Sequence, residues 1–586
     1  MLYRSSIGAV ALAASLGVTT LGATLGGALA FDESKYPDWK GAWRRVAVPG
    51  VVGQPSYDPT KRGGRAQEAP LTPEYQAIFE ANLKDQAAGG QGTDPTYTCL
   101  SPGMPRVMTT FAPFEIVVTP QMTNFLIQHI HDSRRIFTDG REWPKKIVPT
   151  FVGYSIGRWI DTDGDGRYDV LEIETRGLKG PRSYDPAGLP FHSDNQSIFK
   201  ERVYSDKADP NILYDEITTI DNALTRPWTV TKTYARLPIK QPEWVEEVCA
   251  EGNGDVEIGK EGYFLSGDGH LMPTKKDQAP PDLRYFKQIQ NTQTLTPLTE
   301  SPNSDAKSGV SIPDLSGIWG RWFNLEPPSS GPGPIVSKLR RPDATIIQSV
   351  VGDYTNPILR PEAAATIKRI GEMELGGTVL PNPHNQCWPE PSPFILSIQL
   401  GMQLIQQKDE VVLLYLSDHQ VRHVRLNVPH SVHQVPSWQG ESVGHYEGGT
   451  LVIDTIGQKV GPLSMVDRYG TPFSAALHVI ERYRLIDGTM ARDLQQKHES
   501  AYFGAGRSSP PNNPYGRGDV DPDPTKPGLQ VEITVDDPAT FATPWSALVT
   551  YRRVQGTWPE AVCAENTRGS GSSWVSLVPQ ALKPDF

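Results

Sequence analysis

Short segments in which hydrophobic and polar positions alternate recur along most of the chain, and they predict β-strands. Examples in the two halves are residues 114–119, 125–130 and 169–175, and 411–416, 450–455, 477–485 and 529–535. Turn residues (Gly, Pro, Asp) separate them, as is typical of antiparallel sheets. Because an open sheet edge promotes aggregation, we predict mainly β, lipocalin-like barrels or sandwiches, each with a short helix before its first cysteine.

The same pattern occurs twice, because short strings return in the same order. The string PDWKGAW (37–43) returns as PDLSGIW (313–319), RPWTVTKTYAR (226–236) as TPWSALVTYRR (543–553), and VCAEGN (248–253) as VCAENT (562–567). We therefore predict a duplicated domain. The predicted divisions are a signal peptide (1–30), a first repeat (31–266), a linker (267–310) and a second repeat (311–586), with an exposed loop inserted at 504–528.

The N-terminus predicts export. Its first 30 residues hold one charge, Arg4, and end in Ala28-Leu29-Ala30, the small-residue pattern that signal peptidase accepts. A transmembrane anchor is the alternative, but no basic stop-transfer flank follows. No later stretch is apolar for long enough to span a bilayer. We expect a periplasmic or extracellular protein.

Composition excludes several classes of function. The formal net charge is −11 without a Lys/Arg-rich run, so we expect neither nucleic acid nor acidic membrane surfaces as partners. The chain also lacks a Gly-rich phosphate loop, a G-x-S-x-G elbow and a dinucleotide fingerprint. These absences argue against a nucleotide cofactor and against ordinary serine hydrolases.

Several strings are similar to those of a known group. GYSIGRW (153–159), LVIDT (451–455) and LHVIERY (477–483) resemble a large group of uncharacterised secreted bacterial proteins, and the resemblance covers both repeats but implies no reaction. That group has a His-Ser pair, which the first repeat keeps as His192-Ser193, whereas the second has Ser474 without the histidine. The second keeps His478 and Glu481. The two repeats therefore need not share an activity.

The four cysteines lie near the start and the end of each repeat. In an exported protein this symmetry predicts the disulfides Cys99–Cys249 and Cys387–Cys563. A metal site is the alternative, but C-x-x-C spacing is absent.

Histidines make the second repeat the stronger candidate for chemistry, because it holds eight of the twelve. His419 and His423 lie on a predicted strand at positions that share one face. Carboxylates nearby can orient an imidazole or act as a base. The predicted catalytic set is His419, Asp418, His445, Asp467, His478 and Glu481. The alternative is that these histidines cap turns or face solvent. Zinc is disfavoured, because H-E-x-x-H spacing is absent.

The segment DTDGDGRYDVLE (161–172) predicts a structural calcium site. It fits the twelve-residue calcium loop, with Gly166 at the sharp turn. The predicted ligands are Asp161, Asp163, Asp165, the Arg167 carbonyl, Asp169 through water, and Glu172. The alternative is an acidic hairpin tip that only aids solubility.

These features favour binding of a small hydrophobic or aromatic molecule within a repeat. The second repeat would then carry out cofactor-free lyase, hydratase or isomerase chemistry with His and Asp/Glu side chains. A non-catalytic periplasmic carrier and a structural surface module are the alternatives.

Overall fold

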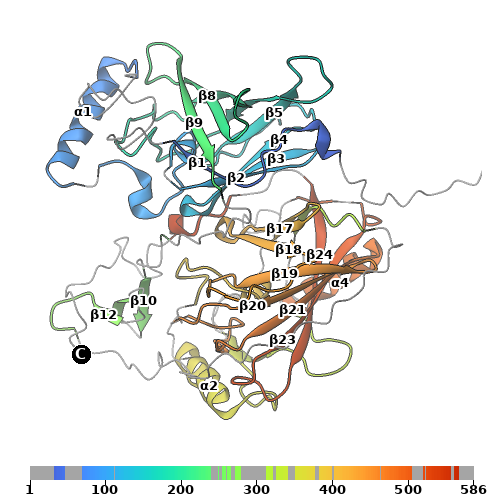
Figure 1. The fold of residues 1–586 in the computed structure, drawn as a ribbon. Coiled ribbons are helices and arrows are strands. Elements are labelled where there is room, and N and C mark those ends of the chain that lie inside the picture. The colour runs from blue at the N-terminus through green and yellow to red at the C-terminus, as the bar shows by residue number, and fades with distance from the viewer. Residues whose placement is uncertain are drawn as a thin grey trace, which may run out of the picture.

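The computed structural model describes residues 32–46, 69–90, 92–110, 112–238, 249, 254–258, 261–265, 271–278, 312–320, 325–340, 350–375, 382–398, 401–461, 463–503, 519–521, 523–555 and 560–566. The predicted signal peptide lies outside these residues. Within them the chain forms two β-barrels, one from each predicted repeat (Figure 1). The mainly β prediction is confirmed, and the sheets are closed barrels rather than sandwiches.

The first barrel is closed by nine strands that follow one another in chain order, and one helix, α1 (Pro73–Ala87), precedes Cys99. Its strands are β1 (Ala42–Arg45), β2 (Phe114–Val118), β3 (Met122–Ile127), β4 (Asp132–Phe137), β5 (Tyr154–Ile160), β6 (Val170–Arg176), β7 (Ile198–Ser205), β8 (Ile212–Ile220) and β9 (Trp228–Arg236).

The second barrel repeats this order, and pairing of its first strand with β24 closes it. Its nine strands are β13 (Gly317–Gly320), β16 (Met402–Gln406), β17 (Glu410–Tyr415), β18 (Val421–Leu426), β19 (Glu441–Glu447), β20 (Thr450–Ile456), β21 (His478–Ile486), β23 (Gly528–Asp536) and β24 (Trp545–Gln555). The short β22 (Asp519–Val520) extends the edge beside β24. In both barrels only the fourth and fifth described strands pair in parallel, so the two barrels match strand by strand.

Two additions depart from the sequence prediction. The predicted linker begins inside a small sheet of β10 (Gly254–Ile258), β11 (Glu261–Leu265) and β12 (Leu271–Pro273). The insertion in the second repeat starts earlier than predicted, with the helix α4 (Gly488–Phe503), and residues 504–518 lie outside the described part. The remaining elements are β14 (Ser337–Arg340), β15 (Val350–Gly352), α2 (Pro361–Leu375) and α3 (Phe394–Ser397).

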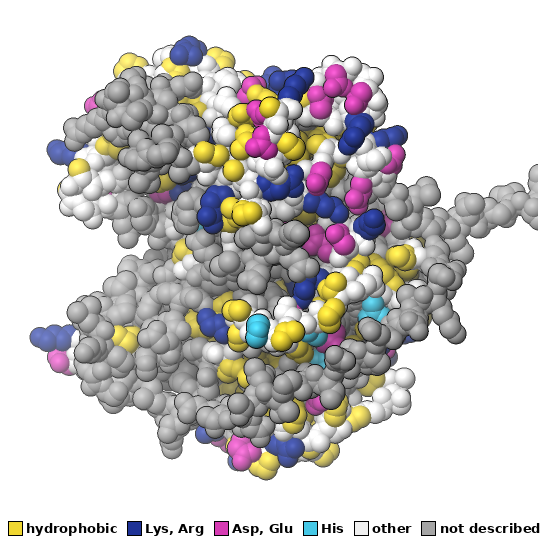
Figure 2. Space-filling model, in the orientation of Figure 1, with side chains coloured by type: hydrophobic (Ala, Val, Ile, Leu, Met, Phe, Trp, Pro, Cys, Tyr) yellow, Lys and Arg dark blue, Asp and Glu magenta, His cyan; other side chains and the backbone are white. Residues whose placement is uncertain are grey.

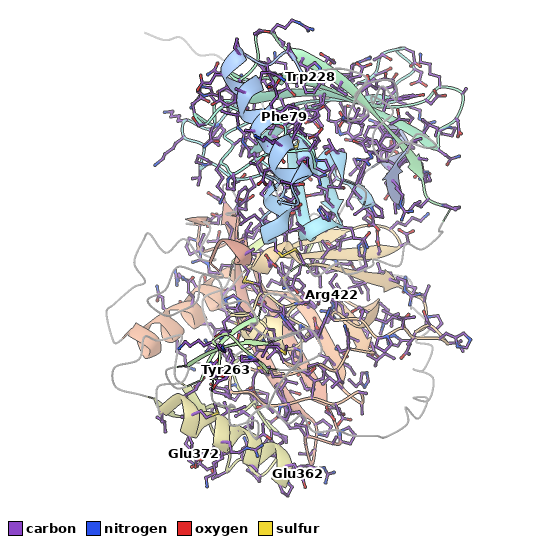
Figure 3. The ribbon with its side chains drawn as sticks, turned by 90° about the vertical axis from the view of Figure 1, so that its left-hand side faces the viewer. Phe79, Trp228, Tyr263, Glu362, Glu372 and Arg422 are labelled. Atoms are coloured by element: carbon purple, nitrogen blue, oxygen red, sulfur yellow. A yellow bond between two sulfur atoms is a disulfide. The ribbon has the colours of Figure 1, made fainter. Side chains whose placement is uncertain are left out.

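The predicted helix before each first cysteine is confirmed, and α1 covers one end of its barrel. The Thr72 side chain accepts a hydrogen bond from the Tyr75 amide and Pro73 occupies the first turn, which are both favoured helix starts. Phe79 packs with Trp228 at the start of β9, as Figure 3 shows. We call Phe79, Tyr184, Leu189, Trp228 and Val230 the cap cluster.

The two barrels pack through equivalent strands. Val117 and Leu126 of the first barrel form a buried cluster with Ile405, Val412, Leu414 and Val421 of the second. Arg135 Nε donates to Gln403 Oε1 at 2.8 Å, and at the positions related by strand register His423 Nε2 lies 3.4 Å from Glu115 Oε2. The interface therefore has an approximate two-fold symmetry, as in an isologous dimer.

The described surface gives two further results. None of the described helices is long and apolar enough to cross a membrane.

On the face drawn in Figure 2, the visible histidine side chains lie on the second barrel.

Candidate functional site

Each barrel encloses a buried arginine–glutamate ion pair at the same position in its sheet. Arg134 contacts Glu201 at 2.6 Å in the first barrel, and Arg422 contacts Glu481 at 2.9 Å in the second. The strand registers make the two arginines equivalent, and likewise the two glutamates. Because both barrels keep the pair, it belongs to their common core.

Hydroxyl groups complete the pair in the second barrel. Arg422 Nη2 donates to Thr455 Oγ1 at 2.5 Å, and Glu481 accepts hydrogen bonds from the Tyr483 hydroxyl at 2.6 Å and from Ser392 Oγ at 2.5 Å. The surrounding interior is a large cluster of buried hydrophobic side chains. The interior of the second barrel therefore resembles a packed protein core.

Three interior positions of the first barrel carry an ionisable or aromatic side chain where the second barrel has a valine. Where the second barrel has Val466, Val531 and Val549, the first has Tyr184, Asp215 and Lys232. Asp215 and Lys232 are 0 % and 1 % exposed, and they lie directly opposite each other on β8 and β9. The Cβ atoms of such a pair are about 4.5–5.5 Å apart. The second barrel therefore shows that the same fold accepts apolar residues at these positions.

Direct partners are scarce at this site. No N–H group or hydroxyl of the described residues donates to the buried carboxyl of Asp215, which instead shares a side-chain hydrogen bond with Glu201 when one of the two carboxyls is protonated. The Lys232 ammonium nitrogen lies 5.1 Å from the ring centroid of Tyr184. Within the described part of the chain, no carboxylate pairs directly with Lys232. Buried polar groups are normally hydrogen-bonded, so the amine of Lys232, which has no such partner among the described residues, is the group that could receive one from a ligand.

Burial also changes the protonation of both groups. It raises the pKa of Asp215 well above its ordinary value, and the neighbouring Glu201 adds to this effect while Arg134 and Lys232 oppose it. Burial lowers the pKa of Lys232 to about 7, with Asp185 and Asp215 opposing and Arg45 assisting. Near neutral pH the site therefore favours a carboxylic acid facing an amine that readily loses its proton.

Of the six predicted catalytic residues, Glu481 lies in the barrel interior, whereas His478 lies on the outer face. His478 and His430 both contact Asp454 Oδ1, at 2.9 and 3.1 Å. Burial disfavours the charged form of His430, but Asp454 and Glu441 outweigh it and raise the pKa of His430 to about 9. This arrangement is a charged surface network in which His430 carries a proton at neutral pH.

His419 does not lie on a strand, which corrects the prediction that it shares a strand face with His423. Asp418 and His419 have φ values of 47° and 51° in the turn before β18, whereas His423 is on the strand. His419 Nδ1 lies 3.7 Å from Asp132 of the first barrel. Asp418 accepts a hydrogen bond from the Cys563 amide. Both histidines therefore face the barrel interface rather than an interior.

The last two predicted residues lie apart from the others. His445 contacts Glu447 at 3.0 Å on the outer face of β19. Asp467 is buried in a turn, where it accepts hydrogen bonds from the Tyr469 and Thr471 amides, and burial raises its pKa to about 6. The six residues therefore do not form one cluster.

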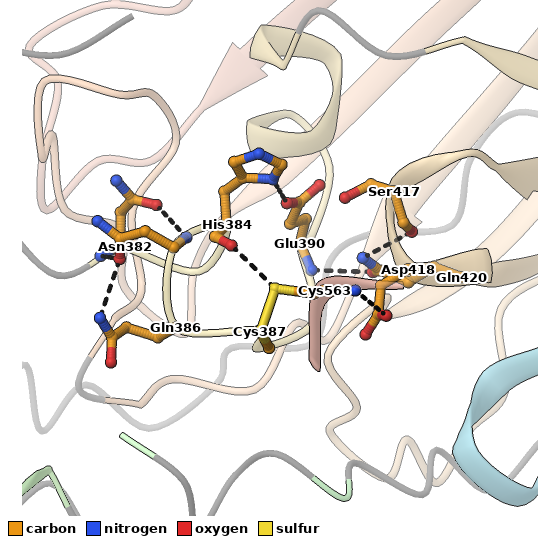
Figure 4. Close-up of a disulfide and its surroundings, with 10 residues drawn as sticks. Asn382, His384, Gln386, Cys387, Glu390, Ser417, Asp418, Gln420 and Cys563 are labelled. Carbon is orange, nitrogen blue, oxygen red and sulfur yellow. Dashed lines mark hydrogen bonds and ion pairs between the residues drawn. A yellow bond between two sulfur atoms is a disulfide. The ribbon is translucent and has the colours of Figure 1, made fainter. Parts of the chain in front are cut away.

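The two predicted disulfides are present. They join Cys99 to Cys249 and Cys387 to Cys563. Figure 4 shows the second bond, where the Cys563 amide donates to Asp418 at 3.1 Å. Just before it, Glu560 accepts a hydrogen bond from the Phe151 amide of the first barrel. The second disulfide thus anchors a segment that crosses to the first barrel.

The predicted calcium loop is the hairpin between β5 and β6. Asp161, Asp163 and Asp165 bring carboxylate oxygens within 4.8 Å of one another. Asp169 instead accepts hydrogen bonds from Thr162, and Glu172 pairs with Arg158 on the neighbouring strand. The Arg167 amide donates to Asp165. Three of the five predicted carboxylate ligands therefore converge.

Calcium is expected to raise the unfolding temperature, because it would neutralise the repulsion among the three aspartates. At ten- to hundredfold excess over Kd, a site confined to the folded state adds roughly 1–3 kcal/mol. Asp163→Ala should abolish the response in differential scanning calorimetry. Glu172→Gln should preserve it, since Glu172 pairs with Arg158. Identical melting curves with calcium and with chelator would contradict the assignment.

Asp215 and Lys232 were missed by the sequence prediction, although a signal for each was present. Within β8 and β9 they alternate in phase with inward residues such as Leu213, Ile217 and Val230. An ionisable residue in the inward phase of a strand is unusual. In the matched strings of the two repeats, Lys232 also stands against Val549. The concentration of histidines in the second repeat points away from these two residues.

Comparison with known proteins adds no identity: no protein-family model and no curated protein matches the chain.

Proposed function

We propose that the first barrel binds a small molecule with a hydrophobic or aromatic body and one polar group, and that Asp215 and Lys232 contact this polar group. The observation that carries the proposal is the buried amine of Lys232, which has no hydrogen bond or ion pair within the described residues and lies opposite the buried Asp215, at positions where the second barrel has valines. An unsatisfied buried polar group costs about 1–3 kcal/mol. Perturbed ionisable groups of this kind concentrate at functional sites.

The surroundings of the site suit such a ligand. Val203, Leu213 and Ile217 form part of the buried hydrophobic core around Asp215. Phe114 packs edge-on against Tyr234 with ring centroids 4.9 Å apart, and the Tyr234 hydroxyl is already hydrogen-bonded to the Met108 carbonyl. Apolar walls with few polar groups are the usual composition of small-molecule sites.

Acid–base catalysis is the second candidate function. A carboxylic acid and an amine with a pKa of about 7 on opposite strands can donate and accept a proton at the same ligand. This pairing favours lyase, hydratase or isomerase chemistry on a bound compound. A carrier would return the compound unchanged, so mass analysis of bound ligands separates the two functions.

The proposal also covers the role of the second barrel and the cellular location of the protein. The second barrel has valines at the positions of Asp215 and Lys232, so we assign it a supporting role. The two disulfides are consistent with an exported protein. We propose that the chain acts in the periplasm or outside the cell after cleavage behind Ala30.

The double variant Asp215→Val/Lys232→Val copies the second barrel and is expected to separate stability from binding. It should raise the free energy of unfolding by about 1–4 kcal/mol, because apolar residues replace buried charges. It should also weaken binding at least tenfold. Benzamide, cinnamyl alcohol, octanamide and benzoate are suitable probes, titrated by calorimetry at millimolar concentration, with urea unfolding measured in parallel.

The matched control changes the same two strands on their outer face. Thr218 and Thr229 are register partners with hydroxyls 2.8 Å apart, so Thr218→Val/Thr229→Val should leave affinity unchanged. If none of the four probes binds the wild-type protein, or if the Asp215/Lys232 variant binds them equally well, the proposed function is wrong. A loss of stability in that variant would assign the pair a structural role.

A further inference from the structure

We infer that Lys232 is a nucleophile that forms an imine with an aldehyde or ketone ligand, and that Asp215 supplies the acid for this step. The inference rests on the proposed function and names its ligand class. The juxtaposition of a buried lysine, a directly opposite aspartate and an aromatic ring supports it.

The geometry leaves the amine available. Lys232 is 1 % exposed, and within the described residues it makes neither a hydrogen bond nor an ion pair that would hold its nitrogen. Tyr184 lies beside it in the cap cluster, and Val230 of that cluster precedes Lys232 in the inward phase of β9. The amine therefore lies just beneath the cap, where α1 covers the barrel end.

The electrostatic environment favours the reactive form. An ordinary lysine has a pKa of about 10.4, so only a small fraction is unprotonated at pH 7. Burial brings the pKa of Lys232 to about 7, so about half of it is the free amine at that pH. Desolvation in an apolar interior is a recognised way to activate Schiff-base lysines.

Local charge favours a neutral carbonyl over an anion. Asp185 and Asp215 are the acidic groups that act on Lys232, and Glu201 lies diagonal to Asp215 across β7 and β8. A carboxylate ligand would add another negative charge to a buried site that already holds acidic groups. A carbonyl ligand adds none, and its oxygen can accept a hydrogen bond from the protonated Asp215.

The reaction balances with the groups present. The Lys232 nitrogen attacks the carbonyl carbon, so an N–C bond forms while the carbonyl π bond breaks. Asp215 protonates the oxygen and takes up the first N–H proton in return, which gives a neutral carbinolamine. Asp215 then protonates the hydroxyl, water leaves, and the imine forms. The second N–H proton returns to Asp215. No electrons are gained or lost, and one water is released.

Reductive trapping tests the inference on the full chain. The protein is incubated with benzaldehyde, cinnamaldehyde or octanal and sodium cyanoborohydride, which delivers hydride to the imine, and peptide mapping locates the resulting secondary amine. Lys232 should be labelled preferentially, with a rate that levels off above about pH 7, whereas exposed lysines should react faster up to about pH 10. Label confined to other lysines would overturn the inference.

Variants assign the roles and separate the two proposals. Lys232→Arg should abolish the label, and Asp215→Asn, which keeps the shape, should slow it at least tenfold. Thr218→Val/Thr229→Val is the unaffected control. If benzamide and cinnamyl alcohol bind but Lys232 is not trapped, the imine is refuted and the proposed function stands. If neither binding nor trapping occurs, both are refuted. Equal trapping in Asp215→Asn would remove the acid role of Asp215.

Discussion

Replacing Arg422 by methionine is expected to destabilise the second barrel by about 3–5 kcal/mol, because Glu481 then remains in the interior without its counter-ion. The two side chains are 1 % and 0 % exposed, so water cannot replace the lost contact. The hydroxyls of Tyr483 and Ser392 would still donate to Glu481, but neither carries a positive charge. Urea unfolding, with hydrogen exchange to localise the change to β21 and β23, measures the effect.

The double variant Arg422→Met/Glu481→Leu is the control for this result. It removes both charges and should recover most of the lost stability, since replacing a whole buried ion pair by apolar residues is often neutral. If the double variant were as unstable as the single one, the cause would be lost packing rather than an unpaired charge.

The architecture could be predicted from the sequence because the patterns that indicate it are local and occur in both repeats. Period-two segments indicated strands, and the recurrence of strings such as PDWKGAW and PDLSGIW indicated two equivalent units. Cysteines at equivalent positions then indicated both disulfides, which the structure contains. Barrel closure depends on pairing between β1 and β9 and between β13 and β24, which are far apart in sequence. The local pattern is therefore compatible with both a barrel and a sandwich.

The candidate site could not be predicted in the same way, because it depends on what each inward position contacts. Glu481 and His478 are close in sequence, yet the odd spacing places them on opposite faces of β21. His419 follows a left-handed turn that no periodicity indicates. Glu172 continues the register of β6 and pairs with Arg158 on β5, a contact that the spacing of the loop does not indicate.

The position of Asp215 is distinctive only when the two barrels are compared. On its own, the alternation in β8 is that of any half-buried strand. Set beside Val531 of the second barrel, the same position carries a carboxyl group where the common fold accepts a hydrophobic residue. The site is therefore identified by the residues that differ between the two barrels at equivalent positions, and not by the residues that they share.

Removing the second disulfide, with Cys387→Ser/Cys563→Ser, is expected to destabilise the protein strongly. The bond closes a loop with a sequence separation of 176, for which the chain-entropy model gives about 5 kcal/mol. It also tethers Glu560, which accepts a hydrogen bond from the Phe151 amide at 3.0 Å and pairs with Lys179 at 3.3 Å. Unfolding of the second barrel should therefore shift to lower urea, and the Phe151 amide should lose protection from hydrogen exchange.

The first disulfide provides the matched control. Cys99→Ser/Cys249→Ser opens a loop of similar separation, 150, within the first repeat and should cost a similar amount by the same entropic reasoning. It leaves the tether of Glu560 in place, because that residue precedes Cys563. The Phe151 amide should then stay protected until the first barrel itself unfolds. Equal loss of Phe151 protection in both variants would show that the second disulfide has no specific role in joining the barrels.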